Sequence, residues 1–214
     1  FKFLWDIGAL PKKIGNEPYK KRTSHGVILG EGGAKMSKSL GNVINPDDVV
    51  EQYGADTLRM YELFLGPHEA TVSWNDRGIV GVRRFYERVW KWVHEQAKNN
   101  TQSNSESVER ALHQLIKKVG SDIESFRFNT AVSSLMILAN EMEKQEVSKD
   151  DYKKFLQLLA PFAPHITEEL WSVLGEKKSI SLSAWPKYDE GKIKDEEVKI
   201  VVQINGKVRA EVMI

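Results

Sequence analysis

Apolar side chains between residues 77 and 174 recur every three or four positions, in successive segments separated by short polar or proline-containing connections. This spacing places one apolar face on each segment, as in helices that pack one side against a shared core. Short connections oblige neighbouring helices to run in opposite directions. The sequence therefore predicts an antiparallel helical bundle, with helices over 77–98, around 112–123, over 129–144, from 148 to 159 and over 165–174, and a polar linker over 99–106.

The first of these helices carries a long apolar stripe. One of its two tryptophans lies on that stripe and the other does not. The stripe comprises Ile79, Val82, Tyr86, Val89, Trp90 and Val93. A tryptophan on such a stripe is expected in the core, whereas Trp92 is the tryptophan that we expect at the surface. His165 stands at the start of the last helix, where a structural role at a bundle junction is favoured over a catalytic one.

Shorter elements are indicated on either side of the bundle. The apolar run 26–29 is typical of a buried strand, and Asn45 followed by proline has the pattern of a helix start. Gly54 divides that helix from a second one over 55–65. Near the C-terminal end the apolar period changes to two around Asn205-Gly206, the strongest short hairpin signal. This predicts a β-hairpin that is a separate element from the bundle.

A glycine-rich turn leads into two lysines and two serines around a methionine, in the order Lys35-Met36-Ser37-Lys38-Ser39. Lysine is a compact cation on a long stem, suited to neutralising charge that develops on a phosphate. Serine hydroxyls and exposed backbone amides can hydrogen-bond the same oxygens. A Walker A loop is excluded, because alanine precedes the first lysine and the glycine spacing differs. A solvated basic turn is the competing interpretation for an arbitrary loop of this composition.

Together with Leu40-Gly41-Asn42, this string resembles the KMSKS signature of class I aminoacyl-tRNA synthetases. Other segments resemble the synthetases for branched aliphatic amino acids and, among these, the leucyl-tRNA synthetases in particular. The first group is 45–50, 53–59 and 159–165, and the second is 64–67, 126–131 and 201–210. The resemblance covers nearly the whole chain apart from the polar linker, and it is a resemblance to the C-terminal portion of that family.

The resemblance implies a mainly α fold in four parts. Residues 1–44 would end a Rossmann-like catalytic domain with its KMSKS loop, and 45–76 would form a connecting helical element of the stem-contact type. Residues 77–186 would form the antiparallel helical bundle of the anticodon-binding type. Residues 187–214 would start a truncated, small α+β C-terminal domain, which the hairpin opens. Both ends of the sequence are accordingly expected to be cut.

The activity implied by the resemblance is that of a leucine–tRNA ligase, which activates leucine with ATP to leucyl-adenylate and transfers it to tRNA(Leu). Lys38, assisted by Lys35, would neutralise charge on the leaving pyrophosphate. The backbone near Met36 would touch the adenine of ATP, and Ser37 and Ser39 would steady the loop. All five residues are thus candidates for ATP binding, and Mg²⁺ is expected with the ATP substrate, although no metal site is visible in the sequence.

The other half of such an active site is not visible in the sequence. None of the five histidines has the context of the His-x-Gly-His motif that class I enzymes pair with the KMSKS loop, and the leucine pocket and editing domain are also missing. The chain alone is therefore expected to be inactive and to need an N-terminal catalytic half, in the same chain or as a separate subunit. The alternatives are a stand-alone tRNA-binding module with a vestigial loop, or the corresponding part of an isoleucyl- or valyl-tRNA synthetase.

Contact with tRNA would have to use local basic faces, because a net charge of +1 gives no global attraction for nucleic acid. Arg83, Arg84 and Arg88 on the long helix are candidates for contact with tRNA phosphates, against the alternative of a solvated helix face. The absence of cysteine excludes a disulfide framework and a cysteine zinc site. No apolar run reaches the length of a membrane span, and a cytoplasmic location is expected.

Overall fold

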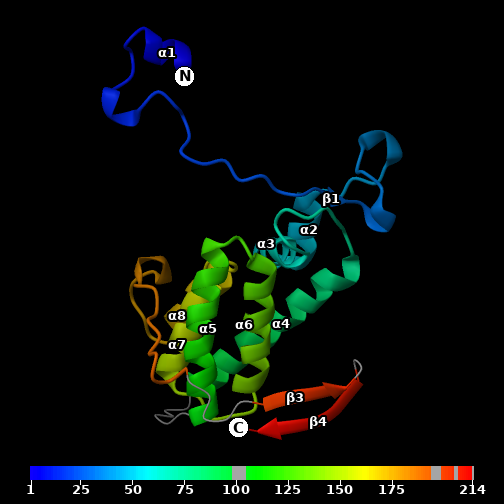
Figure 1. The fold of residues 1–214 in the computed structure, drawn as a ribbon, viewed down its shortest axis with the longest axis vertical. Helices are drawn as coiled ribbons and strands as arrows, with labels where there is room; N and C mark the ends of the chain where they lie inside the picture. The colour runs from blue at the N-terminus through cyan, green and yellow to red at the C-terminus, as the bar shows by residue number, and fades with distance from the viewer. Residues whose placement is uncertain (98–104, 194–198, 205–206, 214) are drawn as a thin grey trace.

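The computed structural model describes residues 1–97, 105–193, 199–204 and 207–213. Within these ranges the chain forms eight α-helices and two two-stranded sheets. It begins with a short helix, α1 (Lys2–Asp6), and an irregular segment that leads from this helix to the rest of the fold (Figure 1). The first strand, β1 (Ile28–Leu29), pairs in parallel with β2 (Val72–Ser73). The predicted strand within 26–29 is therefore present, and its partner lies just before the bundle.

Two short helices follow the first strand, as their start signals predict. Helix α2 (Pro46–Tyr53) begins after Asn45, whose side-chain oxygen accepts a hydrogen bond from the Asp47 N–H at 3.3 Å. Helix α3 (Ala55–Phe64) follows directly after Gly54, which separates the two helices. Helix α3 contacts α4, α6 and α8. The connecting element therefore packs onto the bundle.

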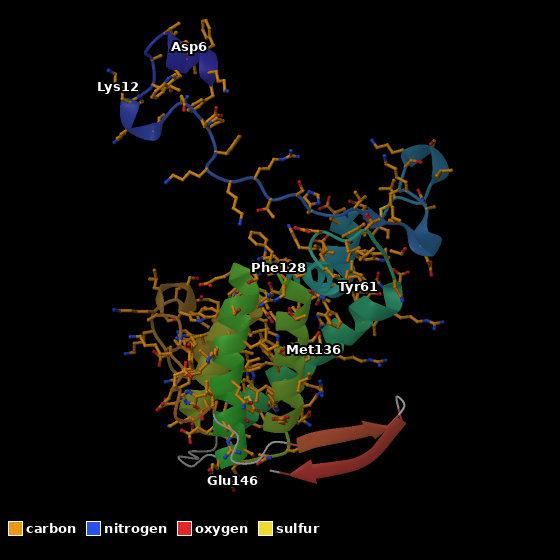
Figure 2. The ribbon with its side chains drawn as sticks, viewed as in Figure 1. Asp6, Lys12, Tyr61, Phe128, Met136 and Glu146 are labelled. Carbon is orange, nitrogen blue, oxygen red and sulfur yellow. The ribbon has the colours of Figure 1, made fainter. Side chains whose placement is uncertain are left out.

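Five helices form the bundle. They are α4 (Asp76–Gln96), α5 (Glu106–Glu124), α6 (Phe128–Met142), α7 (Lys149–Leu159) and α8 (Pro164–Val173). The bounds of four of them lie within two residues of those predicted, whereas α5 begins six residues before the range expected for the second helix. Figure 2 shows α5 and α6 as antiparallel neighbours, with Phe128 at one end of the bundle and Glu146, just beyond α6, at the other. Most of the predicted linker over 99–106 lies outside the described residues.

The core of the bundle is built from the helix faces that the apolar spacing selects. Its largest fully buried side chains include Ile79 from α4, Leu112 from α5, Leu135 from α6 and Phe155 from α7. Helix α7 begins as its sequence predicts, because the Ser148 hydroxyl accepts a hydrogen bond from the Asp151 N–H at 3.2 Å. Such caps satisfy backbone donors that have no partner within the helix.

The turn between α5 and α6 is organised by one buried carboxylate. Asp122 accepts hydrogen bonds from the Arg127 guanidinium at 2.9 Å, the Lys118 ammonium at 2.7 Å and the Thr130 hydroxyl at 2.8 Å. Burial acts to raise the pKa of Asp122, but these three hydrogen bonds outweigh it and hold the pKa below its usual value. Phe126, within this turn, has a φ of 57°, a conformation that non-glycine residues rarely adopt. The carboxylate thus holds a tight turn closed.

The predicted burial of the two tryptophans of α4 is wrong for both of them. Trp90 is 42% exposed, whereas Trp92 is only 7% exposed. The buried face of α4 extends past the predicted stripe to Phe85 and Trp92, and two aromatic residues of α7 contact Trp92. The Trp92 ring lies 5.7 Å from the Tyr152 ring and 6.0 Å from the Phe155 ring, both in edge-on contact. Trp90 lies beyond the opposite edge of the buried face.

The predicted C-terminal strands are present as an antiparallel pair. Strand β3 (Lys199–Ile204) pairs with β4 (Lys207–Met213), and the register shifts between Val202 and Gln203. The predicted turn at 205–206 lies outside the described residues. Within the described parts of the chain, no helix is both long and apolar enough to cross a membrane.

Candidate functional site

The residues predicted to bind ATP lie on a loop between β1 and α2, here named the lysine loop (residues 30–42). Its first part is a small closed ring, in which the Gly30 N–H donates to the Ala34 carbonyl at 2.8 Å and the Gly33 N–H donates to the Gly30 carbonyl at 3.0 Å. A 3₁₀ turn, η3 (Lys38–Leu40), forms its last part. The lysines therefore belong to a folded loop rather than to an irregular segment.

The middle of the lysine loop is held by the side-chain amide of Asn42. The Asn42 oxygen accepts a hydrogen bond from the Ser37 N–H at 2.9 Å, and the Asn42 nitrogen donates to the Lys35 carbonyl at 3.3 Å. These two contacts lie on either side of Met36, which packs partly buried against the core. Gly41 turns the chain back toward the loop with a φ of 64°, in the left-handed region that glycine adopts without strain.

The two serines of the signature contact each other. The Ser37 hydroxyl accepts a hydrogen bond from the Leu40 N–H at 3.3 Å and so caps η3. The hydroxyls of Ser37 and Ser39 lie 3.2 Å apart. Both side chains thus have partners inside the loop.

The two lysines differ from the serines in this respect. Lys35 and Lys38 are exposed, and across the described residues neither ammonium group has a hydrogen bond or an ion pair. A lysine without a carboxylate partner can bind an incoming anion without first breaking a protein contact. The loop therefore presents two ammonium groups, three residues apart, that have no partner among the described residues. Hydrogen bonds within the loop hold the backbone that carries them.

The lysine loop is connected to the bundle through the parallel strands. The Trp74 N–H donates to the Leu29 carbonyl at 2.9 Å, directly after β2. The next residue, Asn75, caps α4 by accepting from the Arg77 N–H at 2.9 Å, and its backbone contacts the buried Tyr61 hydroxyl of α3. The residue just before the loop is thus joined by one backbone hydrogen bond to the residues that precede the first helix of the bundle.

The joint between the connecting element and the bundle depends on Asp56, a residue that the sequence does not single out. Asp56 is 8% exposed, and its carboxylate accepts from the Ile166 N–H at 2.7 Å and lies 2.8 Å from the His165 Nδ1. Its carbonyl accepts from the Tyr86 hydroxyl at 3.1 Å, and burial raises the pKa of that tyrosine. His165 thus lies at the start of α8 and at the junction with α3, as predicted, and Asp56 of α3 caps the first turn of α8.

The three arginines of α4 do not form one free basic patch. The Arg83 guanidinium binds the Glu87 carboxylate at 2.8 Å and the Tyr53 carbonyl at 3.3 Å. Arg88 binds the Asn140 side chain at 2.8 Å and the Glu143 carboxylate at 3.1 Å. Arg84 is exposed. Two of the three predicted phosphate ligands thus already have acceptors within the protein, and the prediction of tRNA contact remains a prediction.

Two of the cavities in the described part of the chain border α3, away from the lysine loop. One of about 620 Å³ is bounded by α3, α4 and α8 and includes Asp56, Trp90 and His165 in its wall. Another of about 470 Å³ lies between the parallel strands and α3, beside His68 and Phe128. In the parts of the chain that the structure describes, no group of three or more His, Cys, Asp or Glu side chains is placed to hold a metal ion.

The segment that follows the bundle, residues 187–193, is fastened along α5 by polar contacts. The Asp189 N–H donates to His113 Nδ1 at 3.0 Å, and the Lys117 ammonium lies 3.2 Å from the Glu190 carboxylate. His113 is buried, and this burial lowers its pKa. Further along, the Lys192 ammonium hydrogen-bonds Glu109 at 2.5 Å and lowers the pKa of that carboxyl. This segment leads to the C-terminal strands.

Comparisons with known proteins match two parts of the chain to family models. Residues 106–214 match the family model of the anticodon-binding domain of tRNA ligases, and residues 10–75 match that of the class I tRNA synthetases for I, L, M and V. The ternary complex of the Agrobacterium radiobacter K84 agnB2 LeuRS with tRNA and LeuAMS is similar over 100% of this chain, at 32% identity and a TM-score of 0.80. This chain spans 30% of the length of that LeuRS.

A second solved structure is similar in fold. The Mycobacterium tuberculosis methionyl-tRNA synthetase, in complex with methionyl-adenylate, matches 72% of this chain and 38% of its own length, at 17% identity and a TM-score of 0.60. At this level of identity the likeness concerns the fold alone.

Proposed function

Because this chain belongs to the class I tRNA synthetases of the I, L, M and V group, we propose that it is the part of a leucine–tRNA ligase that supplies the KMSKS loop and a tRNA-binding helical domain. The complete ligase activates leucine with ATP to leucyl-adenylate and transfers the leucine to tRNA(Leu). The observation that carries the proposal is the lysine loop, a braced turn with two exposed ammonium groups that have no partner among the described residues.

The choice of leucine is supported by the pattern of similarity. A LeuRS matches the full length of this chain at 32% identity, whereas a methionyl-tRNA synthetase matches 72% of it at 17% identity. The sequence segments 64–67, 126–131 and 201–210 also resemble leucyl enzymes. The nearest competing proposals are isoleucyl- and valyl-tRNA synthetases, which share the same fold.

The lysine loop would act in the activation step. When the leucine carboxylate attacks the α-phosphate of ATP, negative charge accumulates on the departing pyrophosphate. A positioned ammonium group stabilises such developing charge by about 3–4 kcal/mol, in the manner of one oxyanion-hole donor. We assign this role to Lys38, with Lys35 assisting and the backbone near Met36 contacting the adenine.

An N-terminal catalytic half would complete the site. Large apolar side chains are exposed across the first part of the chain, including Phe3 at 72%, Tyr19 at 80% and Leu40 at 67%. Large apolar side chains that stay exposed along one segment of a chain are typical of a surface that another domain covers. This supports a catalytic half as the partner of residues 1–44. The match of residues 106–214 to an anticodon-binding domain supports contact of the bundle with tRNA.

ATP–pyrophosphate exchange tests the proposal. It should be measured with leucine, isoleucine, valine and methionine, for this chain alone and for this chain mixed with the N-terminal half of a leucyl-type synthetase. Exchange that depends on leucine and appears only in the mixture is the expected result. Exchange with isoleucine or valine instead would reassign the amino acid. Binding of tRNA without exchange in any mixture would favour a stand-alone tRNA-binding module and refute the proposed ligase role.

A further inference from the structure

Asn42 makes a two-point contact with the backbone on both sides of Met36. Its amide oxygen accepts from the Ser37 N–H at 2.9 Å, and its amide nitrogen donates to the Lys35 carbonyl at 3.3 Å. An asparagine side chain offers an acceptor and a donor in one plane, and both are used here on the same short stretch of chain. The contact fixes the backbone that separates the two lysines.

Asn42 caps neither of the neighbouring helical elements. Helix-capping roles nearby are filled by other residues, since Ser37 caps η3 and Asn45 caps α2. Gly30 makes room for the amide, because a Cβ there would lie 3.1 Å from the Asn42 nitrogen and 3.4 Å from the Ala34 carbonyl oxygen. The Asn42 side chain is thus committed to the lysine loop and packed against its closed ring.

A brace of this kind matters because the rest of the loop is rich in glycine. Glycine backbones lose the most conformational entropy when they are ordered. A contact that orders the loop before a ligand arrives removes part of that cost from the step in which the ligand is used. For a lysine that must meet charge on a leaving group, a displacement of about 1 Å changes a rate by about 100-fold.

We propose that Asn42 is a positioning residue for amino-acid activation, which sets the backbone on which Lys35 and Lys38 are carried toward the polyphosphate. This inference rests on the proposed function. It assigns Asn42 to one step of the reaction, because transfer of leucine from a formed adenylate to tRNA has no departing pyrophosphate to neutralise. A residue needed only for folding would affect both steps.

The test compares Asn42→Ala with Asn45→Ala, a matched variant that removes the same side chain from a helix cap three residues away. Both variants of the chain are mixed with the catalytic half and assayed for leucine-dependent pyrophosphate exchange and for transfer from added leucyl-adenylate to tRNA. Asn42→Ala should lower the exchange kcat by about 10- to 100-fold, with transfer unchanged. Asn45→Ala should leave both rates near wild type. Gly30→Ala, which crowds the amide, should lower exchange by a smaller factor.

Hydrogen exchange on the chain alone gives an independent measurement. The Ser37 amide should exchange faster in Asn42→Ala and remain protected in Asn45→Ala. The positioning role of Asn42 would be overturned by a wild-type rate of hydrogen exchange at the Ser37 amide in Asn42→Ala. Equal losses of pyrophosphate exchange and of transfer to tRNA would overturn it too. If the wild-type mixture shows no pyrophosphate exchange, the proposed function fails. In that case hydrogen exchange at the Ser37 amide still tests whether Asn42 holds the loop backbone in place. Unchanged protection of this amide in Asn42→Ala would refute the structural role as well.

Discussion

Replacing Asp56 by alanine should destabilise the joint between the connecting helices and the bundle more than any exposed ion pair could. The carboxylate accepts a hydrogen bond from the Ile166 N–H at 2.7 Å, and hydrogen bonds to a charged group contribute about 1.5–3 kcal/mol. Its pairing with His165 adds at most about 0.5 kcal/mol, because the histidine side chain is 75% exposed. The expected loss is therefore about 2–3 kcal/mol.

Urea unfolding followed by circular dichroism, together with thermal melts, measures this loss. A chain of this length should lose about 2–4 °C of melting temperature for each kcal/mol, which predicts a decrease of about 5–10 °C for Asp56→Ala. His165→Ala is the control, and it should change the free energy of unfolding by less than about 0.5 kcal/mol. Equal effects of the two variants, or no effect of Asp56→Ala, would refute the assignment of the cap on α8 to this carboxylate.

Three further perturbations have defined outcomes. Lys38→Ala should lower single-turnover adenylate formation by at least ~100-fold, with an unchanged melting temperature, because its ammonium group has no partner among the described residues. Burial lowers the pKa of His113 in the folded chain. The unfolded chain therefore binds a proton first, near pH ~6.5. Stability should be complete above that pH and fall as the pH decreases toward the lower folded pKa. His113→Asn, which keeps an acceptor for the Asp189 N–H, should reduce this slope in urea titrations at several pH values. Asp122→Ala should cost about 2–3 kcal/mol in urea unfolding, because it removes the acceptor of Arg127 and two other donors.

The positions of the helices could be predicted because their signals are local. Asn45 and Ser148 stand directly before the helices that they cap, and the apolar spacing of α5, α6 and α7 selects the faces that are buried. The tryptophans of α4 show the limit of that spacing. Which edge of a helix is covered depends on the neighbouring helix, and only the structure places Tyr152 and Phe155 beside Trp92.

Some residues of the candidate site could likewise be predicted from the sequence, and others could not. The lysines and serines of the loop are recognisable from their order in the sequence, whereas the brace formed by Asn42 is not, because an asparagine after glycine is also common in ordinary turns. Asp56 is harder still to predict. Its partner Ile166 lies 110 residues away, and no periodicity relates the two positions. Contacts between distant polar groups depend on the packed fold, which the local patterns do not specify.

Neither Lys35 nor Lys38 has an ion-pair partner among the described residues, and this determines how the lysine loop responds to ionic strength. In a loop whose cations are held by carboxylates, added salt weakens both the internal pair and the contact with a ligand, and the two effects partly cancel. Here no internal pair is seen among the described residues. Salt therefore screens only the attraction between the ammonium groups and an approaching polyanion, over a distance of about 8 Å at physiological concentration. Capture of polyphosphate by this loop should accordingly weaken steadily as salt is added, without an optimum.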